Sequence, residues 1–138
     1  MARTDSFKEQ HKEMLELVKQ INSGLDPVKL AQDASQVRST LSALAGKLLV
    51  HLSMEDKNLY PVMINSNDEN AKKTAQSFMD EMGTLAGAFK DYTNKWPSPQ
   101  AIQANPAAFC DETKAVFTAI GQRIGKEEAT LYPLADKI

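Results

Sequence analysis

A histidine and a glutamate spaced four residues apart, His51 and Glu55, form the clearest chemical motif in the sequence. On a helix, residues at i and i+4 project from one face about a turn apart, so a ring nitrogen and a carboxylate oxygen can reach one point. Pairs of this kind hold metal ions inside helical bundles. A second histidine, His11, and a second glutamate, Glu127, fall on the apolar seams of other helical segments. The four residues together predict a metal site.

The elements that must position these residues are amphipathic helices. Glycine, proline and polar turn residues divide the chain into four helical segments, at about 5–22, 27–64, 69–95 and 106–138. Each segment carries one apolar seam with alternating spacings of four and three residues, and no alternating strand pattern occurs. We therefore predict an all-α, antiparallel up-down four-helix bundle, with residues 1–138 forming one domain.

Composition excludes several classes of protein. The formal charge is −2, from 16 basic and 18 acidic residues, so a nucleic-acid binder or a polybasic membrane-surface protein is not expected. The longest aliphatic run is only three residues, at 48–50, and the first residues lack the apolar core of a secretory signal. A single cysteine, Cys110, excludes an intramolecular disulfide. These features predict a cytoplasmic protein, and they point to no particular protein partner.

Five charged or titratable side chains interrupt the apolar seams: His11, His51, Glu55, Arg123 and Glu127. Burying an unpaired charge is costly, so these side chains must satisfy one another or share an ion. A lone histidine on an apolar face is more often a hydrogen-bonded core residue than a ligand. The presence of the other four at matching seam positions favours the ligand role.

An internal repeat relates the two halves of the chain. Residues 51–61 read HLSMEDKNLYP and residues 123–133 read RIGKEEATLYP, so Glu55 matches Glu127 at an offset of 72. A weaker match at an offset of 71 places Met82 opposite His11. The repeat predicts two helical hairpins related by a pseudo-twofold axis, with both histidines in the same half.

The sequence resembles the hemerythrin-like family, also called the HHE cation-binding domain. The features that carry the resemblance are His11, His51-x-x-x-Glu55 followed by Leu59-Tyr60-Pro61, and Glu127 followed by Leu131-Tyr132-Pro133. The resemblance covers essentially the whole chain. It implies a bundle holding two non-haem irons bridged by two carboxylates, here Glu55 and Glu127, and it matches His11 and His51 to iron-binding histidines.

The chain departs from the family pattern in one half. Glu81-Met82 stands where the family has an acidic residue and a histidine, and Arg123 replaces the histidine four residues before Glu127. A thioether is a poor ligand for a hard metal, and a guanidinium cannot ligate. We therefore expect one metal ion, held by His11, His51, Glu55 and Glu127. Arg123 would pair with both glutamates as a built-in cation, Met82 would pack beside it, and Glu81 would flank the seam.

Three functions follow from this site. The first is a metal-binding sensor or carrier for dioxygen, nitric oxide or iron, with non-haem iron as the expected metal and manganese or zinc as alternatives. The second is a metal-free degenerate bundle that serves as an interaction or scaffold module, in which Arg123 forms a buried ion pair. The third is an enzyme, which is the least favoured because no acid–base or nucleophilic set exists apart from the metal residues.

Overall fold

Four long helices dominate the computed structural model, which describes residues 2–138 and has no strand within them. They are α1 (Asp5–Ser23), α3 (Ser35–Asn58), α5 (Glu69–Lys95) and α7 (Pro106–Lys126). The shorter elements are α2 (Pro27–Gln32), α4 (Tyr60–Ile64), α6 (Pro99–Ala104), the π-helical segment η1 (Glu127–Leu131) and α8 (Tyr132–Lys137). The predicted all-α fold is confirmed.

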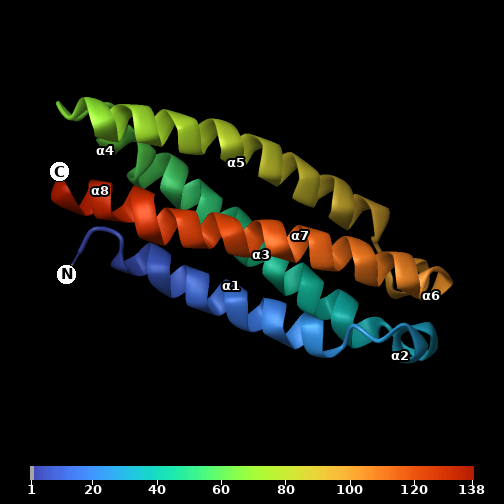
Figure 1. Ribbon diagram of the computed structural model, residues 1–138. Coiled ribbons are helices and arrows are strands. Elements are labelled where there is room, and N and C mark those ends of the chain that lie inside the picture. Colours follow the sequence, from blue (N-terminus) through green and yellow to red (C-terminus); the bar gives the residue numbers. More distant parts are fainter. Residues whose placement is uncertain (1) are drawn as a thin grey trace.

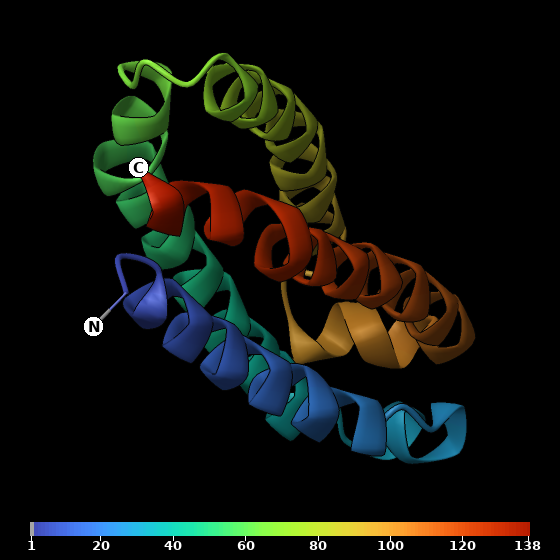
Figure 2. The same ribbon diagram turned by 60° about the vertical axis from the view of Figure 1, so that its left-hand side comes forward.

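The long helices run alternately up and down and form the predicted four-helix bundle (Figure 1). Helix α1 packs along α3 and α7, while α5 packs against α7 and α4. Both views place the two termini at one end of the bundle and the short helices α2 and α6 at the other (Figures 1 and 2). At the end with the termini, the buried Thr4 bonds the Asp136 carboxylate through its amide, at 3.1 Å, and through its hydroxyl, at 2.9 Å.

The second predicted helix, at 27–64, is not continuous. Asp33 is extended, and its carboxylate accepts a hydrogen bond from the Ser35 amide, which ends α2 and starts α3. Pro61 has no amide hydrogen to donate, so the helix breaks again at Leu59. The break rotates the chain, and Met63 is buried instead of Val62, although Val62 lies seven residues after Glu55 and so continues the apolar seam of a regular helix. The prediction of one helix was therefore wrong at both ends of α3.

The last predicted helix, at 106–138, contains a π-helical turn. Asn105 caps its start by accepting from the Ala108 amide, as the Asn-Pro sequence predicts. Towards its end, the Tyr132 amide donates to the Glu127 carbonyl, five residues back. Such turns insert one extra residue and occur often at functional sites. Here the turn begins at one of the predicted ligands.

The core consists of two apolar clusters with a polar layer between them. Helices α1 and α5 contribute to both clusters, whereas α3 and α7 supply buried residues to one cluster and α4, η1 and α8 supply them to the other. On α1, for example, Phe7 belongs to one cluster and Met14 to the other, with His11 between them. The polar layer is therefore enclosed by packed side chains above and below.

No helix among residues 2–138 has the length and apolar character needed to cross a membrane.

Candidate metal centre

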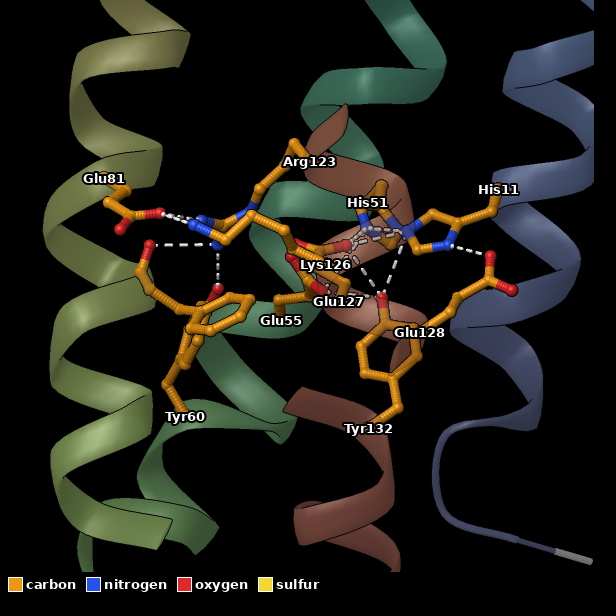
Figure 3. A network of polar contacts seen from close by, with 11 residues as sticks. His11, His51, Glu55, Tyr60, Glu81, Arg123, Lys126, Glu127, Glu128 and Tyr132 are labelled. Carbon is orange, nitrogen blue, oxygen red and sulfur yellow. Dashed lines mark hydrogen bonds and ion pairs between the residues drawn. The ribbon is translucent and has the colours of Figure 1, made fainter. Parts of the chain in front are cut away.

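Three elements bring the predicted ligands into the polar layer. His11 comes from α1, His51 and Glu55 come from one face of α3, and Glu127 comes from the first residue of η1. All four side chains are nearly inaccessible to solvent. In Figure 3 the two glutamates lie between the histidines on one side and Arg123 on the other.

The donor atoms of these residues converge. The Nε2 atoms of His11 and His51 are 3.2 Å apart, and Glu127 Oε1 lies 2.8 Å from the first and 3.5 Å from the second. These three donors all lie within 4.8 Å of one another and form a group that could hold a metal ion. Glu55 is outside this compact group, although its Oε2 lies 3.4 Å from His51 Nε2. Its Oε1 is buried and has no hydrogen-bond partner among the described residues.

Both histidines are anchored from outside the centre through their other ring nitrogen. His11 Nδ1 lies 2.7 Å from Glu128 Oε2, and His51 Nδ1 lies 2.6 Å from Gln10 Oε1. Both partners accept hydrogen bonds, so each Nδ1 carries a proton and Nε2 is the ring nitrogen that faces the centre. This arrangement orients both rings toward the centre, as the outer partners of metal-binding histidines commonly do.

Burial and neighbouring charges shift the pKa values of the histidine and glutamate side chains in the centre. Burial alone would lower the pKa of His51, but hydrogen bonds and charges of Glu127 and Glu55 raise it to about 9. Burial raises the pKa of Glu55. Burial acts the same way on Glu127, but hydrogen bonds from both histidines and the charge of Arg123 hold its pKa well below the usual range. The two carboxylates thus differ, and Glu127 is the firmly ionised one.

Arg123 fills the opposite side of the polar layer. Its Nε donates to Glu127 Oε2 at 3.0 Å, and its Nη2 donates to the Tyr60 hydroxyl and the Phe78 carbonyl, both at 2.9 Å. The guanidinium also lies over the Phe78 ring, with its central carbon 4.6 Å from the ring centre. The predicted pairing with Glu127 is present. The predicted pairing with Glu55 is absent within residues 2–138, because the guanidinium turns toward α5 instead.

The remaining predicted residues lie around this arginine. Met82 is buried and lines a cavity of about 10 Å³, room for one water-sized molecule, together with His11, His51 and Arg123. Glu81 is exposed and binds Lys126 Nζ at 2.7 Å, with Arg123 Nη1 3.7 Å away. Glu81 thus pairs with cations at the surface and does not enter the group of donor atoms.

A comparison of the sequence with protein-family models identifies the family to which this chain belongs. The family model described as the hemerythrin HHE cation binding domain matches residues 3–135. The chain belongs to the hemerythrin HHE family. No curated protein and no solved structure matched it in the other two comparisons. Membership in a cation-binding family implies metal binding, and the group of His11, His51 and Glu127 could hold the ion.

The side chains of this hemerythrin-like chain offer one compact group of donor atoms for a metal ion, from His11, His51 and Glu127. Glu55 Oε2 lies 3.4 Å from His51 Nε2, and Glu55 Oε1 has no partner in residues 2–138. On the opposite side of the polar layer, Arg123 is already bonded to Glu127 Oε2 and Tyr60, where a second cation would need ligands. A guanidinium is permanently charged, so it supplies the positive charge that a second ion would have supplied.

Sequence reasoning about this HHE chain missed three residues of the centre. Gln10 and Glu128 anchor the histidines, and the Tyr132 hydroxyl lies 2.8 Å from Glu55 Oε2 and 3.1 Å from both Glu127 Oε1 and His11 Nε2. Adjacency was the available signal, because Gln10 precedes His11 and Glu128 follows Glu127. Tyr132 belongs to the repeated Leu-Tyr-Pro motif, which pointed to it without giving a role.

Removing the anchor of His11 is expected to weaken metal binding. In a Glu128→Ala variant, His11 Nδ1 loses its carboxylate acceptor, and losses of such outer partners typically reduce metal affinity about 10–100-fold. The measurement is competition with a chelator of known affinity. Asp56→Ala is the matched control, since Asp56 occupies the equivalent repeat position but is exposed and bonds no histidine in residues 2–138. Equal affinities for the two variants would contradict the anchoring role.

Proposed function

We propose that this protein binds one non-haem iron ion and serves as a sensor or carrier for a small diatomic ligand such as dioxygen or nitric oxide. The proposed ligands are His11, His51, Glu55 and Glu127. Support comes from the family match over residues 3–135 and from the convergence of the four side chains in a buried layer.

The observation that carries the proposal is the close approach of two histidine ring nitrogens beside a carboxylate. His11 Nε2 and His51 Nε2 are 3.2 Å apart, while Glu128 and Gln10 hold the protons on the opposite nitrogens. Two lone pairs that face each other beside a carboxylate repel unless a cation lies among them. A proton on His51, whose pKa is raised to about 9, can meet this need without metal, and a metal ion would replace that proton.

The donor set indicates the class of metal. Two imidazole nitrogens and two carboxylate oxygens suit iron(II), manganese(II) or zinc(II), and the family resemblance favours iron. When bound, an iron ion supplies a Lewis-acidic position at which a diatomic molecule can bind. The protein contributes an adjoining cavity of about 10 Å³, lined by apolar residues such as Met14, Leu48 and Ile120 together with the side chains of the centre. Its size selects for the smallest ligands.

Arg123 limits the chemistry available to the site. Reversible oxygen carriage in hemerythrins uses both irons to move two electrons, and the second position is filled here by the guanidinium. A single iron can supply only one electron on going from the ferrous to the ferric state. We therefore place binding and sensing of a ligand ahead of two-electron oxygen carriage.

The test is an anaerobic titration with iron(II) followed by nitric oxide. We expect one iron per chain, and then one nitric oxide per iron, detected by changes in the optical and electron paramagnetic resonance spectra. Iron-loaded protein that does not respond to nitric oxide or to air would contradict the sensor or carrier role.

The second candidate function is a metal-free scaffold, which the bonding of Arg123 favours. Nε and Nη2 of this side chain already bind Glu127, Tyr60 and the Phe78 carbonyl, so protein atoms alone satisfy two of the three guanidinium nitrogens. A scaffold would be colourless, and its thermal unfolding would be the same with and without chelator. A fall in the unfolding temperature when chelator removes bound metal would exclude it.

A further inference from the structure

A second cavity, larger than the one at the metal centre, lies between α3 and α5. Its volume is about 450 Å³, within the range of about 300–1,000 Å³ that is typical of small-molecule sites. Leu48 and Phe89 line it and are buried, whereas Leu52 is half-buried and Leu49 is 69% exposed. The cavity is therefore an apolar groove that is closed at its base and open to solvent.

The cavity exists because α3 and α5 diverge and carry small residues where they border it. The two helices are joined through α4 at one end and lie farther apart at the end with α2 and α6 (Figure 2). Helix α3 packs mainly against α1, and α5 packs against α4 and α7. The small residues are Ala45 on α3 and Ala86 and Gly87 on α5. A Cβ atom added at Gly87 would meet no described atom within 4 Å outside its own helix backbone, so the space beside it is free.

The cavity has a polar end and an apolar end. Because α3 and α5 run in opposite directions, the later lining residues of α5 lie toward the earlier lining residues of α3 (Figure 1). Lys90 and Thr93 therefore lie toward Ala45, at one end. Ala86 lies toward Leu52, at the other end. This polarity matches a molecule with a polar group at one end and an apolar body.

The charge at the polar end selects the polar group. Lys90 is exposed, and within residues 2–138 no acidic side chain lines the cavity or pairs with this lysine. Lys95 on the same helix, by contrast, is paired with Glu112 at 2.8 Å. An unpaired ammonium group beside an apolar cavity is complementary to a carboxylate attached to a hydrocarbon chain. Exposed ion pairs add little to affinity, so burial of the chain must supply most of it.

We propose that this cavity binds an unbranched aliphatic monocarboxylate of medium chain length. Its carboxylate pairs with Lys90, and its hydrocarbon chain lies along the groove toward Leu52 and Ala86. The site requires no metal and so goes beyond the proposed function of the metal centre.

The charge of the lining also disfavours a second copy of the chain as the occupant. A twofold contact brings the same surface of both copies together. The groove offers a cation and, within residues 2–138, no acidic side chain in its lining, so two such grooves have no charge complementarity.

The experiment is a calorimetric titration of the wild-type protein with decanoate. We expect saturable binding of one molecule per chain. Hexanoate should bind at least about tenfold more weakly, because each buried methylene group changes the affinity roughly fourfold. Acetate, which has the carboxylate without the chain, should not bind measurably. Decyltrimethylammonium, which has the chain with a positive head group, should bind more weakly than decanoate.

Two variants test the place of the ligand. Gly87→Phe fills the cavity from α5 and should weaken decanoate binding at least about tenfold. Gly121→Phe is its matched control at an exposed helical position on α7 and should bind as the wild type does. Lys90→Gln should weaken binding about 2–5-fold, as the loss of an exposed ion pair does. Lys73→Gln, an exposed position on the same helix outside the lining, should leave it unchanged.

Several results would overturn the proposal. One is the lack of saturable decanoate binding by the wild-type protein up to about 1 mM, the limit of weak binding. Equal affinity for decanoate and decyltrimethylammonium would show that the lysine does not read the head group. Equal decanoate affinity in folded Gly87→Phe and Gly121→Phe variants would place the ligand elsewhere. A wild-type dimer in gel filtration that becomes monomeric in Gly87→Phe would make a second copy the occupant. Because the wild-type selectivity alone can contradict the proposal, the test does not depend on the folding of any variant.

Discussion

A His51→Ala variant is expected to take up no metal under conditions in which the wild-type protein binds one ion per chain. His51 Nε2 lies 3.2 Å from His11 Nε2 and 3.4 Å from Glu55 Oε2, so the substitution removes the donor atom that lies near both of these proposed ligands. The variant keeps only one nitrogen donor, so an ion that favours two imidazole ligands would be held by far fewer bonds. Each lost ligand of a structural or catalytic metal removes a large part of the binding free energy.

The measurement is metal content after gel filtration, with helical content checked by circular dichroism. Met82→Leu is the control, because Met82 lines the same cavity and stands opposite His11 in the repeat, but it is not a proposed ligand. This control should keep wild-type metal content. Unchanged metal content in a folded His51→Ala variant would show that the ion binds elsewhere.

A double variant, Met82→His with Arg123→His, is expected to bind two metal ions per chain. A histidine at position 123 lies four residues before Glu127 and reproduces the spacing of His51 and Glu55. Loss of the guanidinium frees Glu127 Oε2 and removes a positive charge from the second position. Glu55 Oε1 already has no partner in residues 2–138, so both carboxylates gain an oxygen that can face a second ion.

Two single variants separate the ligand effect from the charge effect. Arg123→Met removes the cation without adding a ligand and should still bind one ion, while its metal-free form should be destabilised by about 3–5 kcal/mol because Glu127 loses its buried partner. Met82→His alone should also bind one ion, since Arg123 remains. If the double variant folds and still binds one ion in excess metal, the arginine is not what prevents a dinuclear centre.

The sequence was sufficient to predict the layer in which the site lies. Polar residues that interrupt an apolar seam must fall between apolar residues of the same helix, and His11 does so between Phe7 and Met14. Because the interruptions on α1, on α3 and at the junction of α7 and η1 lie at corresponding heights, the bundle brings His11, His51 and Glu127 together. Seam periodicity therefore predicts which side chains share a layer.

Periodicity could not predict the local departures from an ideal helix. At Pro61 the missing amide shifts burial from Val62 to Met63, which a continuous seam does not anticipate. The π-helical turn that starts at Glu127 is another such departure, and the two successive residues Glu127 and Glu128 contact the two ring nitrogens of His11. In an ideal helix, neighbouring side chains point about 100° apart around the axis, so periodicity alone does not place two successive glutamates on one histidine ring. Roles for Glu128 and Gln10 required atomic positions.

The pairing of Arg123 also depended on packing that the sequence does not contain. Charge counting predicted one arginine between two carboxylates, but the guanidinium reaches the Tyr60 hydroxyl and a backbone carbonyl of α5 instead of Glu55. Glu55 is left with one buried oxygen, Oε1, that has no hydrogen-bond partner in residues 2–138. This difference strengthens the case for a cation near Glu55.

The number of iron ions bound per chain tests the mononuclear centre most directly. Wild-type protein is equilibrated anaerobically with excess iron(II), freed of loosely bound metal by gel filtration, and analysed for iron and for protein by amino-acid analysis. We expect a ratio of one, because His11, His51, Glu55 and Glu127 provide one set of donors and Arg123 fills the second position. Two firmly bound irons per chain, or none, would contradict it.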